Sequence, residues 1–184
     1  MTTIKFAKLR PDAKIPSKET ENAGYDIYAA FDEDYIVISP GQTVMVPTGL
    51  CSAFSEDYVM ILKERGSTGT KGMGQRSGVI DSGYRGEWFI PITNHNSFKT
   101  IFISKLSLED TLKDYYKDMC MGIDNLSSEK LMNSGKFILY PYEKAIAQAL
   151  LLPVPQTVVC EMSPEEIRAI DSNRGSGALG SSGK

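Results

Sequence analysis

The stretch that decides the fold runs from residue 36 to residue 47 and reads IVISPGQTVMVP. Two runs of β-branched residues flank a Pro-Gly pair, and this pattern predicts two strands joined as a β-hairpin rather than a helix. Further short apolar segments, each bounded by Gly, Pro, Asn or Ser, are also expected to be strands. These segments cover residues 58–62, 87–93, 136–140, 147–153 and 157–161. The sequence therefore predicts an all-β sandwich or barrel.

Two segments break the strand pattern and are expected to be helical. From residue 106 to residue 121, apolar residues recur at helical spacing, and Ser107 with Asp110 fits a capping box in which Asp replaces the usual Glu. A further short turn is expected around residues 128–132. The second helix is expected to begin in residues 163–167, SPEEI, where a serine cap, a proline at the first helical position and two acids suit a helix N-terminus.

Composition limits the class of protein. The 184 residues are 41% hydrophobic and 23% charged, which is ordinary for one globular domain. A net charge of -3 argues against broad binding to nucleic-acid backbones, which requires clustered Lys and Arg. No stretch approaches the roughly 20 apolar residues of a membrane helix, and residues 1–10 lack the apolar core of a secretory signal. We therefore expect a cytoplasmic location, with no membrane and no nucleic-acid partner.

The last residues differ in character from the rest of the chain. Residues 172–184 are almost all Gly, Ser and Ala, which leaves too little apolar surface to offset the entropy of ordering them. We expect one β domain over residues 1–171 and a tail over residues 172–184 that is mobile without a ligand.

Five sequence clusters carry a resemblance to a known family. They are AGYDI at 23–27, RGSTG at 65–69, GVIDSGYRG at 78–86, AIAQ at 145–148 and RGSGALGSSG at 174–183. In this order they resemble the motifs of the trimeric dUTPases. The resemblance implies a jelly-roll-like β-barrel with a small inserted helical segment, assembled as a homotrimer with each active site between subunits. It also implies hydrolysis of dUTP to dUMP and pyrophosphate with Mg²⁺.

The third cluster contains the candidate catalytic residue. Residues 78–80 predict a buried strand that delivers Asp81 to the start of a Ser-Gly turn, where a carboxylate can bind a water. The resemblance implies that Asp81 orients this water for in-line attack on the α-phosphorus. An isolated Asp in a turn more often accepts from backbone N–H groups, but the surrounding motif favours the catalytic interpretation.

The same cluster is expected to select the nucleoside. By resemblance, the ring of Tyr84 lies against the deoxyribose and leaves no room for a 2′-hydroxyl. Gln75 stands at the interval before Asp81 where some family members have an asparagine for uracil, and a primary amide can pair with the O4 and N3–H edge; a plain surface glutamine is the alternative. Backbone groups of the hairpin are expected to bind uracil at Val79, Ile80 and Phe89.

The other clusters are expected to bind the phosphates and the metal. Asp26 corresponds to a carboxylate that holds Mg²⁺ through water, or supports the catalytic base and its loop. A structural role in a turn is the alternative. Arg65, Gly66 and Ser67 form a loop whose backbone N–H groups can reach phosphate oxygens. The family usually has Pro-Arg-Ser here, so Gly66 predicts a slower enzyme unless Ser67 takes the place of the missing hydroxyl. Gln148 is expected to reach a phosphate oxygen from a buried strand, or to be a polar edge residue.

The fifth cluster resembles a phosphate-binding lid, although a Gly-Ser tail taken alone is usually a disordered terminus. Alternating glycines, an arginine fork and two hydroxyls suit the β- and γ-phosphates. Where the family has a phenylalanine stacked over uracil, this chain has a leucine. The residues expected in the lid are Arg174, Gly177, Leu179, Gly180, Ser181 and Ser182.

Residues 88–143 form a longer connection than most family members need, and we expect an insert at about 98–138. Some phage dUTPases use such a segment to contact regulatory proteins, which suggests a phage origin, a host-cytoplasm location and a regulatory partner; a decoration that packs on the barrel is the alternative. A nucleotide-sensing protein with decayed catalysis is a rival function, favoured by Gly66 and Leu179. A dCTP deaminase is disfavoured because its third motif has a glutamate where this chain has Asp81.

Replacing Leu179 with Phe tests the lid. Leucine covers uracil without stacking, so the phenylalanine should tighten closure by ~1 kcal/mol. We expect a lower Michaelis constant for dUTP in steady-state kinetics, and an unchanged or raised value would contradict the assigned role.

Overall fold

The computed structural model describes residues 2–76, 78–118, 134–173 and 175. Contacts within the chain divide it into two compact units, Met1–Val154 and Pro155–Lys184. The β unit therefore ends at Val154, before the predicted boundary at residue 171. The assignment of residues 172–184 to a lid stays a prediction.

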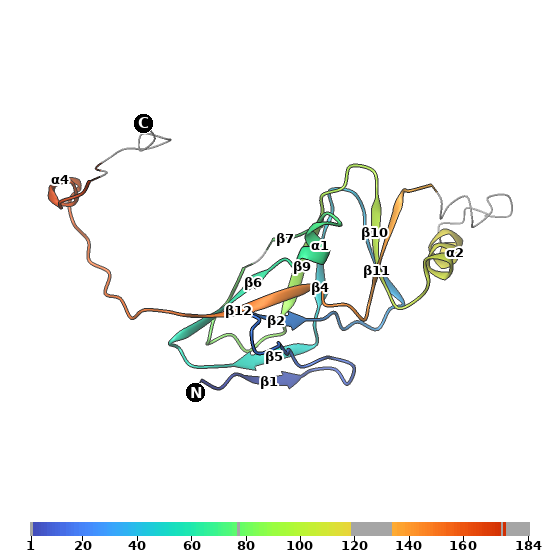
Figure 1. Cartoon of the computed structure of the whole chain (residues 1–184), viewed down its shortest axis with the longest axis horizontal. Helices are drawn as coiled ribbons and strands as arrows, with labels where there is room; N and C mark the ends of the chain where they lie inside the picture. Colours follow the sequence, from blue (N-terminus) through green and yellow to red (C-terminus); the bar gives the residue numbers. More distant parts are fainter. Residues whose placement is uncertain (1, 77, 119–133, 174, 176–184) are drawn as a thin grey trace. The chain divides into compact units, whose positions relative to one another are not determined.

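The first unit is mostly β-structure with few helices (Figure 1). Its paired strands do not close into a barrel among the described residues. The structure therefore confirms a β-rich fold but does not show the expected jelly-roll barrel. The sheets have the strand orders β1-β5, β11-β10-β3, β2-β12-β6-β8 and β4-β9-β7. The strands are β1 (Lys5–Lys8), β2 (Gly24–Ile27), β3 (Tyr35–Ile38), β4 (Thr43–Pro47), β5 (Leu50–Ala53), β6 (Tyr58–Lys63), β7 (Met73–Gln75), β8 (Val79–Ile80), β9 (Phe89–Asn94), β10 (Thr100–Ser104), β11 (Phe137–Pro141) and β12 (Ala147–Pro153). The helices in the described residues are α1 (Gly66–Gly69) and α2 (Leu108–Asp118) of this unit and α4 (Pro164–Ala169) of the second unit.

The stretch at 36–47 forms both predicted strands but not the predicted hairpin. The N–H of Gln42 donates to the carbonyl of Ser39 at 3.0 Å, and Gly41 has a φ of 74°. This is the geometry of a type II turn, which splays the flanking strands instead of matching their twist. As a result β3 pairs with β10, and β4 pairs with β9.

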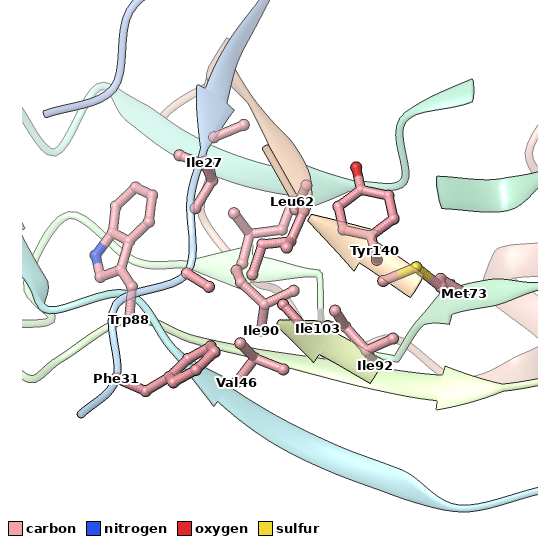
Figure 2. Packing of buried hydrophobic residues seen from close by; sticks show 14 of the residues in the cluster. Ile27, Phe31, Val46, Leu62, Met73, Trp88, Ile90, Ile92, Ile103 and Tyr140 are labelled. Atoms are coloured by element: carbon pink, nitrogen blue, oxygen red, sulfur yellow. The ribbon is translucent and has the colours of Figure 1, made fainter. Parts of the chain in front are cut away.

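The hydrophobic core lies between the sheets and holds the strands that carry the candidate site. Trp88 and Ile90 are fully buried beside Ile27 of β2 and Leu62 of β6, and Tyr140 and Met73 lie at the other end of the cluster (Figure 2). Buried strands with apolar side chains on one face form such a core because burial of apolar surface drives their association. The core therefore fixes β2, β6 and β12 relative to one another.

The predicted helix at 106–121 is confirmed over its described part, α2. Its start is capped as expected, because the N–H of Asp110 donates to the hydroxyl of Ser107 at 3.1 Å. The apolar face of α2 packs through Leu112 on Phe102 of β10. Residues 119–133, which include the turn expected at 128–132, lie outside the described residues.

The structure narrows the expected insert. β10 lies inside the interval 98–138, yet it pairs with β3 and its residues 101–103 are fully buried. It is therefore part of the β core. The connection from β10 to β11, which is parallel to β10, contains α2, and the assignment of an insert to this connection stays a prediction.

The second unit confirms one expectation and overturns another. α4 begins at the predicted place, with the N–H of Glu166 donating to the Ser163 hydroxyl and the Glu166 carboxylate accepting from the Ser163 N–H. The strand predicted at 157–161 is wrong, because these residues pair with no strand in the described part of the chain, and Val158 and Val159 are each 95% exposed. A β-branched run forms a strand only where a neighbouring strand accepts its hydrogen bonds.

No helix among the described residues is long and apolar enough to cross a membrane.

Candidate functional site

A cleft of about 620 Å³ brings three of the sequence clusters together. Its walls come from β2 and the loop before it, from the start of α1, and from β12. The lining residues are Glu21, Asn22, Ala23, Gly24, Asp26, Arg65, Gly66, Ser67, Gln148 and Leu150. The predicted site residues Asp26, Arg65, Gly66, Ser67 and Gln148 thus lie around one space, although they come from distant parts of the sequence.

Strand register places Gln148 at the centre of this cleft. On β12, Gln148 lies opposite Asp26 of β2 on one side and opposite Lys63 of β6 on the other. Its side-chain amide donates to the carbonyl of Glu64 at 2.9 Å. A Cβ on Gly24 would stand 2.6 Å from the Gln148 Oε1 atom, so any larger residue at 24 would displace the Gln148 side chain from this position.

The guanidinium of Arg65 is bound from several directions. Its Nε lies 2.9 Å from Oδ1 of Asp26, and a terminal nitrogen donates to Oδ2 of the same carboxylate at 3.2 Å. The other terminal nitrogen donates to the Ser67 hydroxyl at 3.3 Å and to the Ala145 carbonyl at 3.4 Å. Such a fork is more directional than a lysine contact would be. Arg65 therefore connects β2, α1 and the residues before β12.

The loop at Arg65 is also held by Thr68, a residue that the sequence analysis missed. Thr68 is buried, its hydroxyl accepts from the Arg65 N–H at 3.0 Å, and that hydroxyl donates to the Arg65 carbonyl at 2.9 Å. A threonine three residues after a helix cap is the available sequence signal. By contrast, nothing lies within 4 Å of a Cβ built on Gly66, so this position is open toward solvent.

The donor set of the cleft fits a Mg²⁺ ion that arrives with phosphates. Only Glu21 and Asp26 supply carboxylates to the lining, and no group of three metal-binding side chains occurs in the described ranges. Mg²⁺ commonly uses one or two carboxylates together with waters and substrate phosphates. Because both Asp26 oxygens contact Arg65, Asp26 would hold the ion through water.

The third cluster forms a separate, exposed turn after β8. The hairpin expected here is wrong, because β8 pairs with β6 whereas β9 pairs with β4 and β7. Asp81 and Tyr84 lie at the surface after β8, and the N–H of Tyr84 donates to the Asp81 carbonyl at 3.0 Å. Val79 is 57% exposed and Phe89 is 37% exposed, so apolar surface accompanies the carboxylate. Ile80 instead packs into the core, which limits it to backbone contacts with a ligand. Gln75 is half-buried on β7, outside the cleft lining.

Asp81 does not reach the cleft within one chain. Ile80 pairs with Met60, whereas Gln148 in the cleft pairs with Lys63 at the other end of β6. The interval from residue 60 to residue 63 spans ~10 Å of strand. Since β8 runs antiparallel to β6, Asp81 continues away from the cleft.

The remaining predicted residues belong to the lid. They lie outside the described residues, and they are Arg174, Gly177, Leu179, Gly180, Ser181 and Ser182.

Comparison with known proteins identifies the family. The family model for dUTPase matches residues 12–106. A deoxyuridine 5′-triphosphate nucleotidohydrolase of Leptospira interrogans is 36% identical over 117 residues, which cover 60% of this chain and 80% of the relative. A protein of the same name from Neisseria meningitidis serogroup C is 30% identical over 174 residues, covering 92% and 87%. The chain belongs to the dUTPase family.

Solved structures agree on the fold. The dUTPase of Staphylococcus bacteriophage 80alpha with dUpNHpp superposes with a TM-score of 0.69 at 20% identity, covering 99% of each chain. The dUTPase of phage phi11 of S. aureus, described for its species-specific insert, gives a TM-score of 0.61 at 18% identity, covering 87% of this chain and 96% of the other.

The contact between Arg65 and Asp26 can be measured by a double-mutant cycle. We expect Arg65→Ala and Asp26→Ala to be coupled by about 0.5–3 kcal/mol in the free energy of unfolding, because each single change already removes the shared ion pair. Urea denaturation gives the value. Arg65→Ala combined with Asp57→Ala, at the opposite end of β6, is the control and should be additive; additivity of the first pair would refute the contact.

Proposed function

We propose that this chain hydrolyses dUTP to dUMP and pyrophosphate by attack of water on the α-phosphorus. The observation that carries the proposal is the cleft in which Asp26, Arg65, Ser67 and Gln148 meet in a chain of the dUTPase family. Relatives named deoxyuridine 5′-triphosphate nucleotidohydrolase support the reaction, and the phage 80alpha dUTPase with dUpNHpp supports the substrate. The cytoplasm is the proposed location.

The cleft is assigned to the phosphates. Backbone N–H groups of Gly66 and Ser67, the Gln148 amide and the Arg65 guanidinium are the donors on its walls. Such fixed donors can bind phosphate oxygens without a large cationic surface, which this acidic chain lacks. Ser67 is exposed beside the open Gly66 position, so its hydroxyl is the group available to replace the one that residue 66 does not carry.

The exposed turn after β8 is assigned to the nucleoside and the attacking water. Asp81 is a surface carboxylate that can orient a water and accept its proton as the phosphorus–oxygen bond forms. Tyr84, Val79 and Phe89 offer the apolar surface on which the sugar and uracil would rest. Backbone groups of Val79, Ile80 and Phe89 and the amide of Gln75 are the proposed contacts to uracil.

The separation of the exposed turn and the cleft favours a site built from more than one chain. Asp81 follows Ile80, which pairs with Met60, whereas Gln148 pairs with Lys63, so the water and the phosphates would meet only if a second copy supplied one of the two parts. A homotrimer with the site between subunits provides this arrangement. Residues 172–184 are proposed to close over the nucleotide, with Arg174, Ser181 and Ser182 on the phosphates and Leu179 over the base.

Mg²⁺ is the proposed cofactor, held through water by Asp26. When bound to the triphosphate, it would neutralise oxygen charge that otherwise repels the attacking water.

A regulatory protein that binds the connection between β10 and β11 is a second proposal. The apolar face of α2 is used against Phe102, so the remaining face, which carries the Glu109–Lys113 ion pair, is polar. The phage 80alpha dUTPase is described as controlling transfer of virulence genes by a G protein-like mechanism, and this supports the proposal by likeness of fold.

Asp81→Asn should lower pyrophosphate release from dUTP and Mg²⁺ by about 10²–10⁴-fold, because the amide cannot accept the proton of the attacking water. Binding of dUTP, measured by calorimetry, should persist. Asp34→Asn, at another exposed aspartate, should leave the rate unchanged. If the unaltered chain bound dUTP without turnover, the nucleotide-sensing alternative would replace the hydrolase; ammonia release from dCTP would instead indicate a deaminase.

Mixing inactive chains tests whether the site is shared. Chains with Asp81→Asn and chains with Arg65→Ala each lack one part, but a site that takes residue 81 from one and residue 65 from the other is intact. After co-refolding in equal amounts, about a quarter of the unaltered activity should return if assembly is random. Mixing the Asp81→Asn chain with a chain carrying both changes should restore nothing. No recovery in the first mixture, despite mixed oligomers by mass spectrometry, would place the whole site in one chain.

A further inference from the structure

We propose that Gly86 is a positioning residue that fixes the ring of Tyr84 and thereby sets the preference for deoxyribose over ribose. The proposal rests on the proposed function, in which the Tyr84 ring excludes a 2′-hydroxyl. It assigns part of that selectivity to a residue that has no side chain and need not touch the substrate.

The Tyr84 ring lies directly over the backbone of Gly86. A Cβ built on Gly86 would stand 2.4 Å from the Tyr84 hydroxyl oxygen, 2.6 Å from Cζ and 2.9 Å from Cε2. All three distances are shorter than any normal carbon contact. Any residue other than glycine at 86 is therefore incompatible with this position of the ring.

Tyr84 is held by its own turn at its backbone and at the tip of its side chain. The Tyr84 N–H donates to the Asp81 carbonyl at 3.0 Å, and the phenol hydroxyl donates to the Glu87 carbonyl at 2.9 Å. The hydroxyl thus already makes a hydrogen bond within the same turn. What Tyr84 offers a nucleotide is the face of its ring, which suits steric exclusion.

Glu87 links this turn to the rigid part of the fold. Its carboxylate accepts from the Gly49 N–H at 2.7 Å, and the next residue, Trp88, is fully buried. The Glu87 carbonyl, which accepts the hydrogen bond from the Tyr84 hydroxyl, is therefore fixed relative to the core. These contacts connect the buried core through Glu87 to Tyr84, and they fix the position of the ring relative to Asp81.

A methyl group at residue 86 should move the ring and spare the backbone. Tyr84 is 43% exposed, and the conflicting atoms are at the far end of its side chain, so the ring can swing toward solvent. The chain should then keep its fold and its carboxylate while losing the surface that rejects ribose.

The test compares Gly86→Ala with Gly83→Ala in the full-length protein. Gly83 lies in the same turn, but a Cβ there meets nothing within 4 Å, so it is a matched control. We expect Gly86→Ala to lower the ratio of kcat/KM for dUTP over UTP by at least about tenfold, and Gly83→Ala to leave it within about twofold. Thermal unfolding should confirm that both variants are folded.

A second background separates ring positioning from a general effect on the turn. In Tyr84→Ala the selectivity should already be low, and adding Gly86→Ala should change it no further. Unchanged selectivity in folded Gly86→Ala, or an equal loss with and without the tyrosine ring, overturns the inference. If the unaltered protein released no pyrophosphate from dUTP, the proposed function would fail on its own; relative binding of dUMP and UMP by calorimetry would then decide the inference with the same variants.

Discussion

The candidate site depends on one constraint, the position of β12 between β2 and β6. Gln148 faces Asp26 across one strand pair and Lys63 across the other. Because side chains alternate along a strand, a shift of one residue would turn Gln148 to the opposite face. Ala147 and Ala149, buried on either side of it, oppose such a shift from within the core. Strand pairing therefore determines where the cleft residues lie, and the polar contacts among them are secondary.

The charge of the cleft explains why binding of a triphosphate requires positive groups that the cleft itself does not supply. Glu21, Asp26 and Arg65 are its charged lining residues, which leaves a formal charge of -1. The Arg65 guanidinium is also already neutralised by Asp26. A triphosphate would meet directional donors here but little net attraction. The proposed Mg²⁺ and the arginine of the proposed lid would both supply the positive charge that the cleft lacks.

Local patterns in the sequence predicted single elements well and their partners poorly. The run at 147–153 and the serine caps at 107 and 163 depend on neighbouring residues alone, and the structure confirms them. The hairpin at 36–47 was wrong because its turn type, and not its strand propensity, decides which strand lies alongside. For the site, the order of the clusters indicated the family. The fork of Arg65 on Asp26 forms only once distant strands meet, so no local pattern could predict it. Thr68 had a local signal in its place three residues after the helix cap, but its burial depends on the complete fold.

The parallel pairing of β10 with β11 limits how the region between them can change. Two parallel neighbours cannot be joined by a tight turn, because the chain must first travel back along the full length of the sheet. A deletion that leaves only a few residues between Ser104 and Phe137 would therefore force one strand out of the sheet. Natural variants should therefore keep a bridge of at least about a dozen residues at this point, or rebuild that edge of the sheet altogether.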